Sequence, residues 1–273
     1  MSEAPALPLP PVDLRIPNLA APLQLHVHGE HDRHVSQQLR AHGIWEPFET
    51  ALLLQVLQPD SVFVDVGANI GYFSLVAAAI LRRPASVFAF EPDPDNFRLL
   101  QASARHNQLD AYICAQQLAL ADTDATGRLY LSGDNLGDHQ MHADGTGRSS
   151  IPITVRNGST FLRDRLQRLD FLKVDTQGAE HAVISGLMPL LQELPAAPRI
   201  LIELTPLSLR QAGASGRALI ELLAELSQPM WIVDHIEQRL VASNAGELAR
   251  WCDNVDAVPG DEGFMNILLG PAP

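Results

Sequence analysis

The stretch VFVDVGANIGYFSL, residues 62–75, decides the fold of this chain. Its first part, VFVDV (62–66), is a run of Val and Phe around one acid, which predicts a buried strand. Two glycines, Gly67 and Gly71, follow at once, and an apolar helix is expected over 69–81. A buried strand that passes through a tight turn into a helix is typical of a parallel sheet covered by helices.

The same alternation continues on both sides of this stretch. Further strands are expected at 23–29, 86–91, within 111–120, and at 127–131, 151–155, 169–175, 199–204, 230–234 and 264–270. Helices are expected at 34–58 with a break at Gly43 and Pro47, and at 92–106, 178–193 and 215–226. Because several strands are continuous runs of Val, Ile, Leu and Phe, we expect an α/β fold with a parallel sheet buried on both faces. Ligands bind such sheets beyond the carboxyl ends of the strands.

Composition excludes several classes of protein. A chain of 273 residues forms one large domain, or one domain with appendages. Its 19 Lys and Arg against 32 Asp and Glu give a net charge of −13, which disfavours nucleic acid and anionic lipid as partners. Two cysteines, Cys114 and Cys252, cannot form a disulfide framework or a four-thiolate zinc site.

The sequence gives no sign of membrane insertion or export. The longest apolar run without charges in the first hundred residues, Val66 to Leu81, has 16 residues. That is short of the ~20 residues that a membrane-spanning helix needs. The beginning of the chain is rich in proline and lacks a basic region, so no signal peptide is expected. We therefore expect a soluble, cytoplasmic protein with an N-terminal arm (1–50, a short strand and a helix) and a main domain (51–273).

Acidic residues end the first two strands of the main domain. Asp65 precedes Gly67, and Glu91 follows the next strand, 26 residues further along the chain. An acid in the second position can accept both hydroxyls of a ribose. The alternative for Asp65 is a plain cap of the turn, and for Glu91 a solvated loop.

The glycine spacing differs from two phosphate-binding motifs. If Gly67 is aligned with the first glycine of G-x-G-x-x-G, the other two glycine positions hold Asn69 and Tyr72. No Lys follows the second glycine, as a P-loop requires. An acid at the entrance instead suits a ligand with an amino group and no phosphate.

Three segments carry a specific resemblance: VFVDVGANIGYFSL, FAFEPDPDNFRLL and LDFLKVDTQGAE, in that order. They resemble the FkbM-type family of S-adenosylmethionine-dependent methyltransferases. The resemblance implies a seven-stranded, doubly wound, Rossmann-like sheet (class I methyltransferase) whose last strand is antiparallel. It also implies methylation of a hydroxyl on a sugar, polyketide or other secondary metabolite.

The resemblance also implies a set of cofactor contacts. The methionine part of S-adenosylmethionine would lie among Asp65, Gly67, Ala68, Asn69 and Gly71, the ribose on Glu91, and the adenine beside Pro92, Asp93 and Ala119. Trp45 and Glu46 would cap the pocket, and Asp175, at the end of its strand, would lie over it. One departure is Gln177, where many relatives have an acid.

The fourth and fifth strands of the main domain bring further charges to the same edge. Alternation places Phe171, Lys173 and Asp175 on one face of their strand, and the next strand delivers Glu203. Asp175 and Glu203 could hold a divalent cation or share a proton. Alternatively, Asp175 or Asp65 only pairs with the buried Lys173.

The polar segment 122–158 offers a candidate base. His139, which Asp138 could orient, has an unperturbed pKa near neutrality and could take the proton of a hydroxyl. Asp175 is the other candidate, and a cation held by Asp175 and Glu203 is the third way to activate the hydroxyl. Histidines at 26, 28, 31 and 34 match no standard zinc spacing, so we expect no metal there.

Three other functions remain open at this point. The chain could be a binding module that retains the pocket without the chemistry, a methyltransferase acting on a protein, or, as the weakest alternative, a nicotinamide-dependent oxidoreductase. The identity of the acceptor and the oligomeric state cannot be deduced from these patterns.

Overall fold

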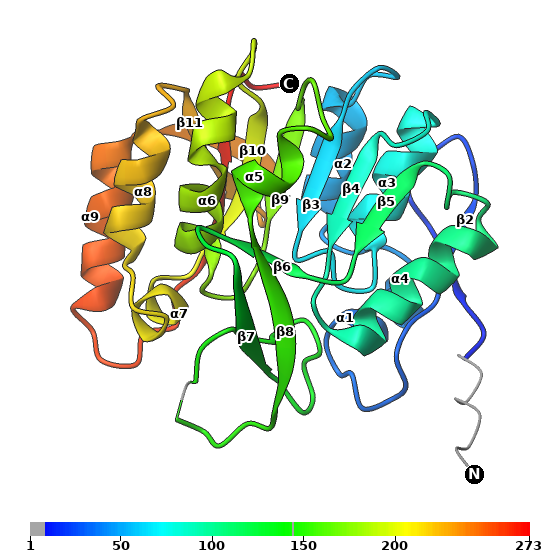
Figure 1. Ribbon diagram of the computed structural model, residues 1–273, viewed down its shortest axis with the longest axis horizontal. Helices are drawn as coiled ribbons and strands as arrows, with labels where there is room; N and C mark the ends of the chain where they lie inside the picture. The colour runs from blue at the N-terminus through cyan, green and yellow to red at the C-terminus, as the bar shows by residue number, and fades with distance from the viewer. Residues whose placement is uncertain (1–8, 144) are drawn as a thin grey trace.

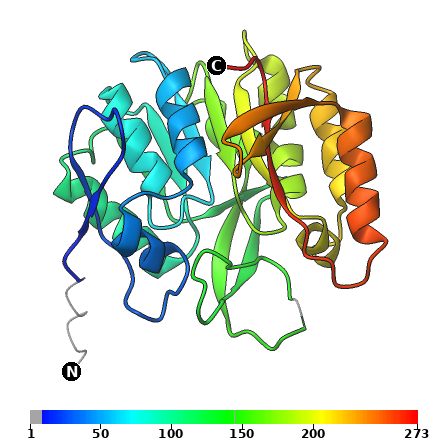
Figure 2. The same cartoon turned by 180° about the vertical axis from the view of Figure 1, so that it is seen from behind.

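A central eight-stranded sheet organises the molecule in a computed structural model that describes residues 9–143 and 145–273 (Figures 1 and 2). The strand order is β12-β11-β13-β10-β9-β3-β4-β5. The strands are β3 (Phe63–Val66), β4 (Val87–Phe90), β5 (Ile113–Gln116), β9 (Phe171–Val174), β10 (Arg199–Leu204), β11 (Met230–Asp234), β12 (Arg239–Ser243) and β13 (Met265–Leu269). Pairing is parallel from β5 to β10, whereas β13 is antiparallel to both β10 and β11.

This order confirms the expected doubly wound sheet and its antiparallel last strand. The structure adds an eighth strand, β12, which pairs with β11 at the edge. That strand is half exposed and carries only Leu240, Val241 and Ala242 as apolar residues, so its sequence lacked the continuous run that marks the buried strands.

Two layers of helices cover the sheet, one on each face. One face packs on α1 (Val35–His42), α2 (Pro47–Val56), α3 (Tyr72–Leu81) and α4 (Pro94–His106). The other face packs on α6 (Glu180–Glu193), α8 (Gly216–Ala224) and α9 (Ala245–Asp256). Phe63 and Phe171 belong to the first core and Leu172 and Val174 to the second, so the predicted alternation of the fourth strand is confirmed.

A smaller sheet projects beside the carboxyl edge of the main sheet (Figure 1). It contains β6 (Ala119–Ala121), β8 (Ser150–Asn157) and β7 (Ala125–Tyr130) in that order. The segment 111–120, expected to contain one strand, therefore divides between β5 in the main sheet and β6 in this one. The remaining elements are the ribbon of β1 (Val12–Leu14) and β2 (Leu23–Leu25), and the short helices α5 (Gly158–Leu162) and α7 (Pro206–Gln211).

The expected division at residue 50 falls inside α2. The arm before it is part of the same core, because Leu25 and Leu39 are fully buried with the first helical layer. The prolines at 5 and 8 of this arm lie outside the described residues. Among the residues that are described, no helix combines the length and hydropathy needed to cross a membrane.

Candidate functional site

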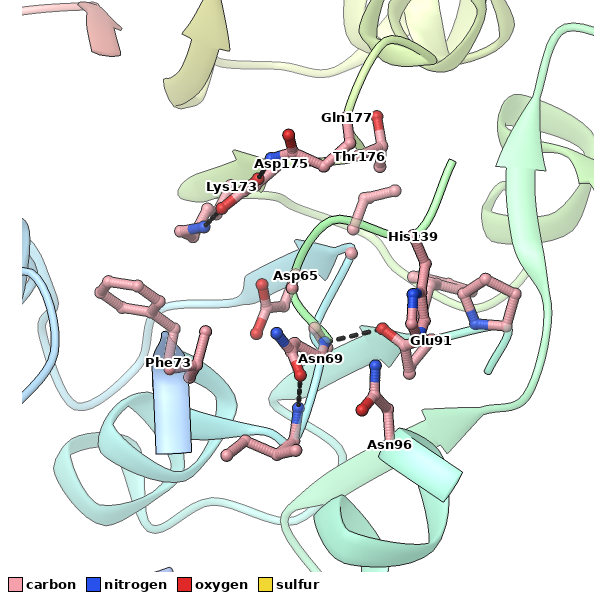
Figure 3. Close-up of a pocket in the computed structure, with 18 of the residues that line it drawn as sticks. Asp65, Asn69, Phe73, Glu91, Asn96, His139, Lys173, Asp175, Thr176 and Gln177 are labelled. Atoms are coloured by element: carbon pink, nitrogen blue, oxygen red, sulfur yellow. Dashed lines mark hydrogen bonds and ion pairs between the residues drawn. The ribbon is translucent and has the colours of Figure 1, made fainter. Parts of the chain in front are cut away.

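The predicted site residues gather in one pocket at the carboxyl ends of β3, β4, β9 and β10 (Figure 3). Twelve of the fourteen predicted residues line it: Glu46, Asp65, Gly67, Ala68, Asn69, Glu91, Pro92, Ala119, His139, Lys173, Asp175 and Glu203. Gly71 and Asp93 do not line it. Gly71 begins α3 at φ +89° against Leu100, and Asp93 caps α4 by accepting the N–H groups of Asp95 and Asn96.

The turn between β3 and α3 uses its own backbone donors. The N–H groups of residues 67–71 donate to Phe90 O (from Gly67 and Ala68), Glu91 Oε2 (from Asn69), Asn69 Oδ1 (from Ile70) and Ala68 O (from Gly71), at 2.7–3.0 Å. A pyrophosphate is normally held by free N–H groups at such a turn. Because these five donors are already paired, the turn is a poor cradle for a dinucleotide.

Gly67 is required for contact between two loops. Its φ is +83°, and a Cβ built there would lie 1.8 Å from the carbonyl oxygen of Asp175. The glycine therefore allows the loop after β3 to touch the loop after β9. This contact brings Asp65 and Asp175 close to each other.

Glu91 is fixed by the backbone on both sides. Its Oε2 accepts the Asn69 N–H at 2.7 Å and its Oε1 accepts the Asp93 N–H at 2.8 Å. Burial raises the pKa of Glu91 to about 8, against these hydrogen bonds. Beyond these two N–H groups the Asn96 side chain is a further hydrogen-bond donor to Glu91. The acceptor positions that remain on the two oxygens can still accept a hydroxyl. This is the arrangement that a vicinal diol such as a ribose requires.

A buried charge cluster occupies the other end of the pocket (Figure 3). Lys173 Nζ lies 2.8 Å from Asp175 Oδ2 and 4.7 Å from the centre of the Phe73 ring. Burial alone would lower the pKa of Lys173, but the carboxylates of Asp175, Glu46 and Asp65 outweigh it and raise that pKa. Lys173 is thus a permanent cation among several acids.

Asp65 faces this cluster from β3, in register with Lys173 on β9. Its Oδ2 accepts the hydroxyl of Ser74 on α3 at 2.6 Å. Burial raises the pKa of Asp65. The carboxylate therefore fixes α3 to the strand as well as lining the pocket.

Gln177 joins the two acids that were candidates for a cation. Its Nε2 donates to Asp175 Oδ1 at 2.9 Å and to Glu203 Oε2 at 2.7 Å. Burial, and then the charge of Asp175, raises the pKa of Glu203 well above its usual value. The amide places a hydrogen-bond donor where a cation would bridge the carboxylates. Within residues 9–143 and 145–273, no three His, Cys, Asp or Glu side chains converge as metal ligands.

Glu180 shapes the loop that presents Gln177. Its carboxylate accepts the N–H groups of Thr176 and Gly178 and the Thr176 hydroxyl, at 2.9–3.2 Å. Gln177 itself is left-handed, with φ +52°. Burial raises the pKa of Glu180 to about 6.

Glu46 enters the pocket from the start of α2. It is the N-cap of that helix at φ +40°, and its Oε2 is buried without a hydrogen-bond partner in the structure. Burial raises the pKa of Glu46 to about 8, with Lys173 opposing and Glu49 adding to the effect. Trp45, next to it, also lines the pocket.

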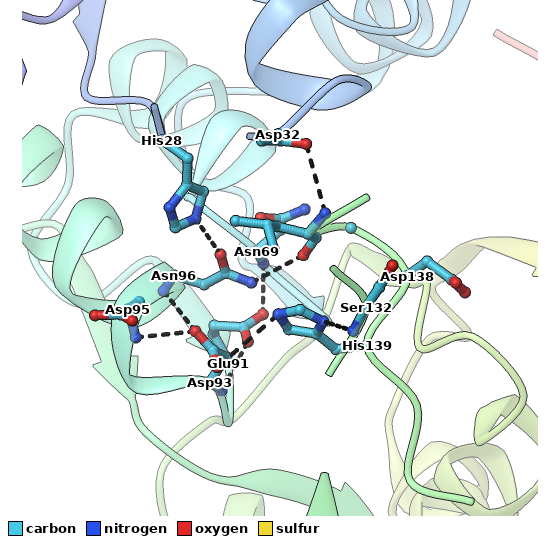
Figure 4. Close-up of polar contacts among 12 residues, drawn as sticks. His28, Asp32, Asn69, Glu91, Asp93, Asp95, Asn96, Ser132, Asp138 and His139 are labelled. Carbon is cyan, nitrogen blue, oxygen red and sulfur yellow. Dashed lines mark hydrogen bonds and ion pairs between the residues drawn. The ribbon is translucent and has the colours of Figure 1, made fainter. Parts of the chain in front are cut away.

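His139 lies beside Glu91, at the far end from Asp175 (Figures 3 and 4). Its Nδ1 accepts the Ser132 N–H at 3.1 Å, which leaves the proton on Nε2, 4.0 Å from Asp93 Oδ2. Burial lowers the pKa of His139, against the charge of Asp93. The expected partner Asp138 instead pairs with Arg148 at 2.7 Å.

Sequence reasoning missed several residues that line the pocket. They include Tyr72, Phe73, Asn96, Met141 and Thr176. Asn96 Oδ1 is 2.6 Å from His28 Nε2, which connects the pocket to the N-terminal arm. The available signal for Asn96 was its place on the first turn of α4, the helix that begins shortly after Glu91 and Pro92. Phe73 and Met141 resemble ordinary core residues in sequence.

The sheet is doubly wound, and an acid that could hold a ribose follows its second main-domain strand. The turn after β3 is a poor cradle for a dinucleotide, and the far end of the pocket is acidic. Together these features define a class I methyltransferase-like α/β domain. A family profile described as "Methyltransferase FkbM domain" matches residues 65–230, and the chain belongs to that family.

Curated relatives are similar over part of their length. "Hexuronic acid methyltransferase AglP" of Haloferax volcanii is 28% identical over 175 residues, 64% of this chain and 66% of that protein. "2-O-methyltransferase NoeI" of Sinorhizobium fredii is 27% identical over 177 residues, 56% of this chain and 70% of that protein. The matches cover no more than 66% of the length of the first three curated relatives.

A solved structure titled as methyltransferase FkbM from Methylobacillus flagellatus KT aligns with 79% of this chain and 45% of that one. Its TM-score is 0.46 and its sequence identity is 14%.

Proposed function

We propose that this protein transfers a methyl group from S-adenosylmethionine to a hydroxyl of a small molecule, a sugar or a secondary metabolite. The observation that supports the proposal is Glu91, which lines the pocket with its two oxygens held by backbone N–H groups and with acceptor capacity left for a ribose hydroxyl. The paired donors of residues 67–71 oppose the nicotinamide alternative, because they leave no anion cradle at the turn.

The pocket suits the donor at both ends. The diol of the nucleoside fits Glu91, with Pro92 and Ala119 at the adenine side. At the other end, the carboxyl groups of Glu46, Asp175 and Glu203 lie around Lys173. A bound ammonium and sulfonium would favour the ionised form of these acids, which suits the donor. When bound, the sulfonium supplies an electrophilic methyl group, so the protein contributes mainly alignment and proton transfer.

In this proposal, a carboxylate takes the proton of the acceptor hydroxyl, and it belongs to the end of the pocket that holds Lys173 and the acids around it. Asp175 is anchored by Lys173 and Gln177, which fits it to orient ligands. His139 lies at the ribose end with both ring nitrogens directed at protein groups, which supports a role in shaping that end. A divalent cation on Asp175 and Glu203 would have to displace the Gln177 amide. Turnover that is unchanged by EDTA is the expected result, and turnover that returns only on adding Mg²⁺ or Mn²⁺ would establish the cation route.

The acceptor class rests on the relatives. Proteins named for methylation of a hexuronic acid and for 2-O-methylation are similar to this chain, so hydroxyls of sugars, acidic sugars included, are the first acceptors to test. The net charge of −13 opposes nucleic-acid acceptors.

The test is binding followed by transfer. Calorimetry should show S-adenosylhomocysteine binding and no NADH binding. Purified protein with methyl-labelled donor and a panel of monosaccharides, uronic acids and macrolide alcohols should then yield a methyl ether identified by mass spectrometry. Donor binding with no product from any acceptor, peptides included, would favour a silent binding module, and labelled peptide alone would favour a protein substrate.

A further inference from the structure

A second polar cluster lies directly behind the pocket, between α2, β13 and the turn after β11. Its centre is Glu49, whose side chain is fully buried. Glu49 Oε1 accepts Asn266 Nδ2 at 3.0 Å and lies 3.1 Å from His235 Nδ1. His235 belongs to the β11–β12 turn, and 36% of its side chain is exposed. The cluster therefore extends from the interior to solvent.

Unpaired oxygens connect this cluster to the pocket. Glu46 Oε2 and Glu49 Oε2 are both buried without a partner in the structure. Glu46 is the N-cap of α2 and Glu49 lies in its first turn. The charge of Glu49 raises the pKa of Glu46, so the two side chains lie near each other. Buried carboxylate oxygens are rarely left unpaired. A proton or water shared between the two acids would satisfy both.

The strand register brings the pocket acid Glu203 to the same place. Glu203 on β10 is directly opposite Asn266 on β13. Asn266 Oδ1 is also buried without a partner in the structure. The pocket acids, Asn266 and the Glu49–His235 pair thus follow one another toward the surface.

We propose that Glu46 takes the proton of the acceptor hydroxyl during methyl transfer, and that Glu49 and His235 conduct this proton to solvent. The proposal rests on the proposed function. It adds a catalytic residue, Glu46, and two residues that act through it.

The step balances in atoms and electrons. The acceptor oxygen forms a bond to the methyl carbon as the carbon–sulfur bond breaks, and sulfur keeps that electron pair. The O–H proton moves to Glu46 Oε2 and then to Glu49, which neutralises the partner of the His235 imidazolium. His235 then releases its Nε2 proton to water, so one proton reaches solvent for each proton taken from the acceptor. The path needs no oxidant or metal.

The charges around these groups set the expected pH behaviour. Glu46 faces Lys173 and Asp175 from β9 and its loop, Glu203 from β10, Glu49 on its own helix, and His235 from the β11–β12 turn. The hydrogen bond to Glu49 raises the pKa of His235, and Glu46 and Asp234 add to the rise. Burial raises the pKa of Glu46 to about 8, so this carboxyl is protonated in the ligand-free protein at neutral pH.

Calorimetry of donor binding tests the proton on Glu46 without an acceptor. Titration of S-adenosylmethionine into the full chain, in buffers of different ionisation enthalpy, counts the protons released. At pH 7 we expect up to about one proton, because a cation beside Glu46 favours its ionised form. S-adenosylhomocysteine, which lacks the sulfonium charge, should release fewer. Glu46→Gln should abolish the difference.

Two further variants should move the pH dependence in opposite directions. The midpoint is the pH at which the protonated Glu46 of the ligand-free protein is half ionised, as read from proton release on donor binding. Glu49→Gln removes a negative neighbour of Glu46, so this midpoint should be lower than in the wild type. His235→Gln removes a positive neighbour, so that midpoint should rise. The exposed Glu237→Gln on the same turn is the matched control and should leave the midpoint unchanged.

Kinetics test the transfer itself, with any acceptor that the panel identifies. Glu46→Gln should lower kcat by roughly 10²- to 10⁴-fold, the contribution of a general base. His235→Gln should lower kcat more at low than at high buffer concentration, and added imidazole should restore part of it.

The outcomes separate the two proposals. Wild-type protein that fails to bind S-adenosylmethionine overturns both the proposed function and this inference. If the wild type binds S-adenosylmethionine and Glu46→Gln releases as many protons on binding as the wild type does, the inference alone is overturned. A midpoint that responds to neither Glu49→Gln nor His235→Gln also overturns it.

Discussion

Glu91 has a structural role, and in the proposed function it also binds the ribose. Two backbone N–H groups fix its carboxylate, which keeps acceptor capacity for a ligand. We expect Glu91→Gln to weaken S-adenosylhomocysteine binding by roughly 10- to 100-fold, because the amide nitrogen cannot accept and would face an N–H group. Calorimetry measures the loss, and Asp95→Asn, on the exposed side of the same helix start, should bind normally. Equal affinity of Glu91→Gln and wild type would remove the ribose assignment.

Glu46 makes the stability of the protein depend on pH. Its pKa is about 8 in the folded chain and 4.5 as the ordinary value, so the folded state binds more protons than the unfolded state between these limits. Ionisation of Glu46 therefore destabilises the fold. The stability that its protonated form contributes is complete below the unfolded pKa and is lost progressively as pH rises to about 8.

Glu46→Gln removes this dependence. Its unfolding free energy, relative to wild type, should increase from about pH 5 to about pH 8 and level off above, with a slope of at most about 1.4 kcal/mol per pH unit. Urea denaturation across this range measures it. If the difference in unfolding free energy between Glu46→Gln and wild type did not change with pH, Glu46 would have its ordinary pKa in the folded chain.

The turn between β3 and α3 depends on one glycine. Gly67→Ala would place a methyl group in contact with the Asp175 carbonyl at φ +83°. We expect a loss of at least about 2–3 kcal/mol, or failure to fold, because neither loop can move without disturbing the site. Thermal unfolding tests it against Gly133→Ala, whose added Cβ would meet no atom within 4 Å. Equal melting temperatures would contradict the proposed loop contact.

Helix α6 holds the small sheet against the pocket through Gly186. A Cβ there would lie 1.9 Å from the carbonyl oxygen of Ala121 on β6. Alanine normally stabilises a helix by about 1 kcal/mol relative to glycine. Gly186→Ala should instead destabilise the protein and weaken donor binding, because Ala119 on β6 lines the pocket. Gly246→Ala on α9, which has more room, should be neutral or stabilising.

The buried elements were predictable because their side chains contact the core on both faces. Strand β11 was expected at 230–234 and is found there, and β10 likewise at 199–204. Helix α9 was missed although Asn244 and Glu247 form a recognisable start, with Asn244 accepting the Glu247 N–H. Its apolar residues are spread among acids, so periodicity alone was weak.

In the site, position at a strand end predicted the acids but not their partners. Asp65 and Glu203 lie in the last two residues of their strands, Glu91 and Asp175 directly follow theirs, and all four line the pocket. The bridge that Gln177 makes depends on its left-handed backbone, which the sequence does not announce. Glu49 and His235 are 186 positions apart (235 − 49), and only the fold brings them together.

At the scale of the whole molecule, the N-terminal arm belongs to the domain. A chain truncated to residues 51–273 would lose the buried Leu25 and Leu39, the first turn of α2, and Trp45 and Glu46 of the pocket. We expect it to be aggregated or partly unfolded, with no donor binding. Circular dichroism and calorimetry test this directly, and a stable truncated chain that binds S-adenosylhomocysteine would re-establish a boundary near residue 50.

The paired donors of residues 67–71 also limit what this scaffold could be redesigned to hold. Replacing Asn69 and Tyr72 by glycine would complete the G-x-G-x-x-G spacing without creating a dinucleotide site. The amides that must meet phosphate oxygens already donate to Phe90, Glu91 and their own turn. A designer would first have to remove the Glu91 carboxylate and the Asn69 side chain, and so give up ribose recognition. If the proposed function holds, specificity for a phosphate-free nucleoside is set by the backbone of this turn, which a side-chain substitution alone does not change.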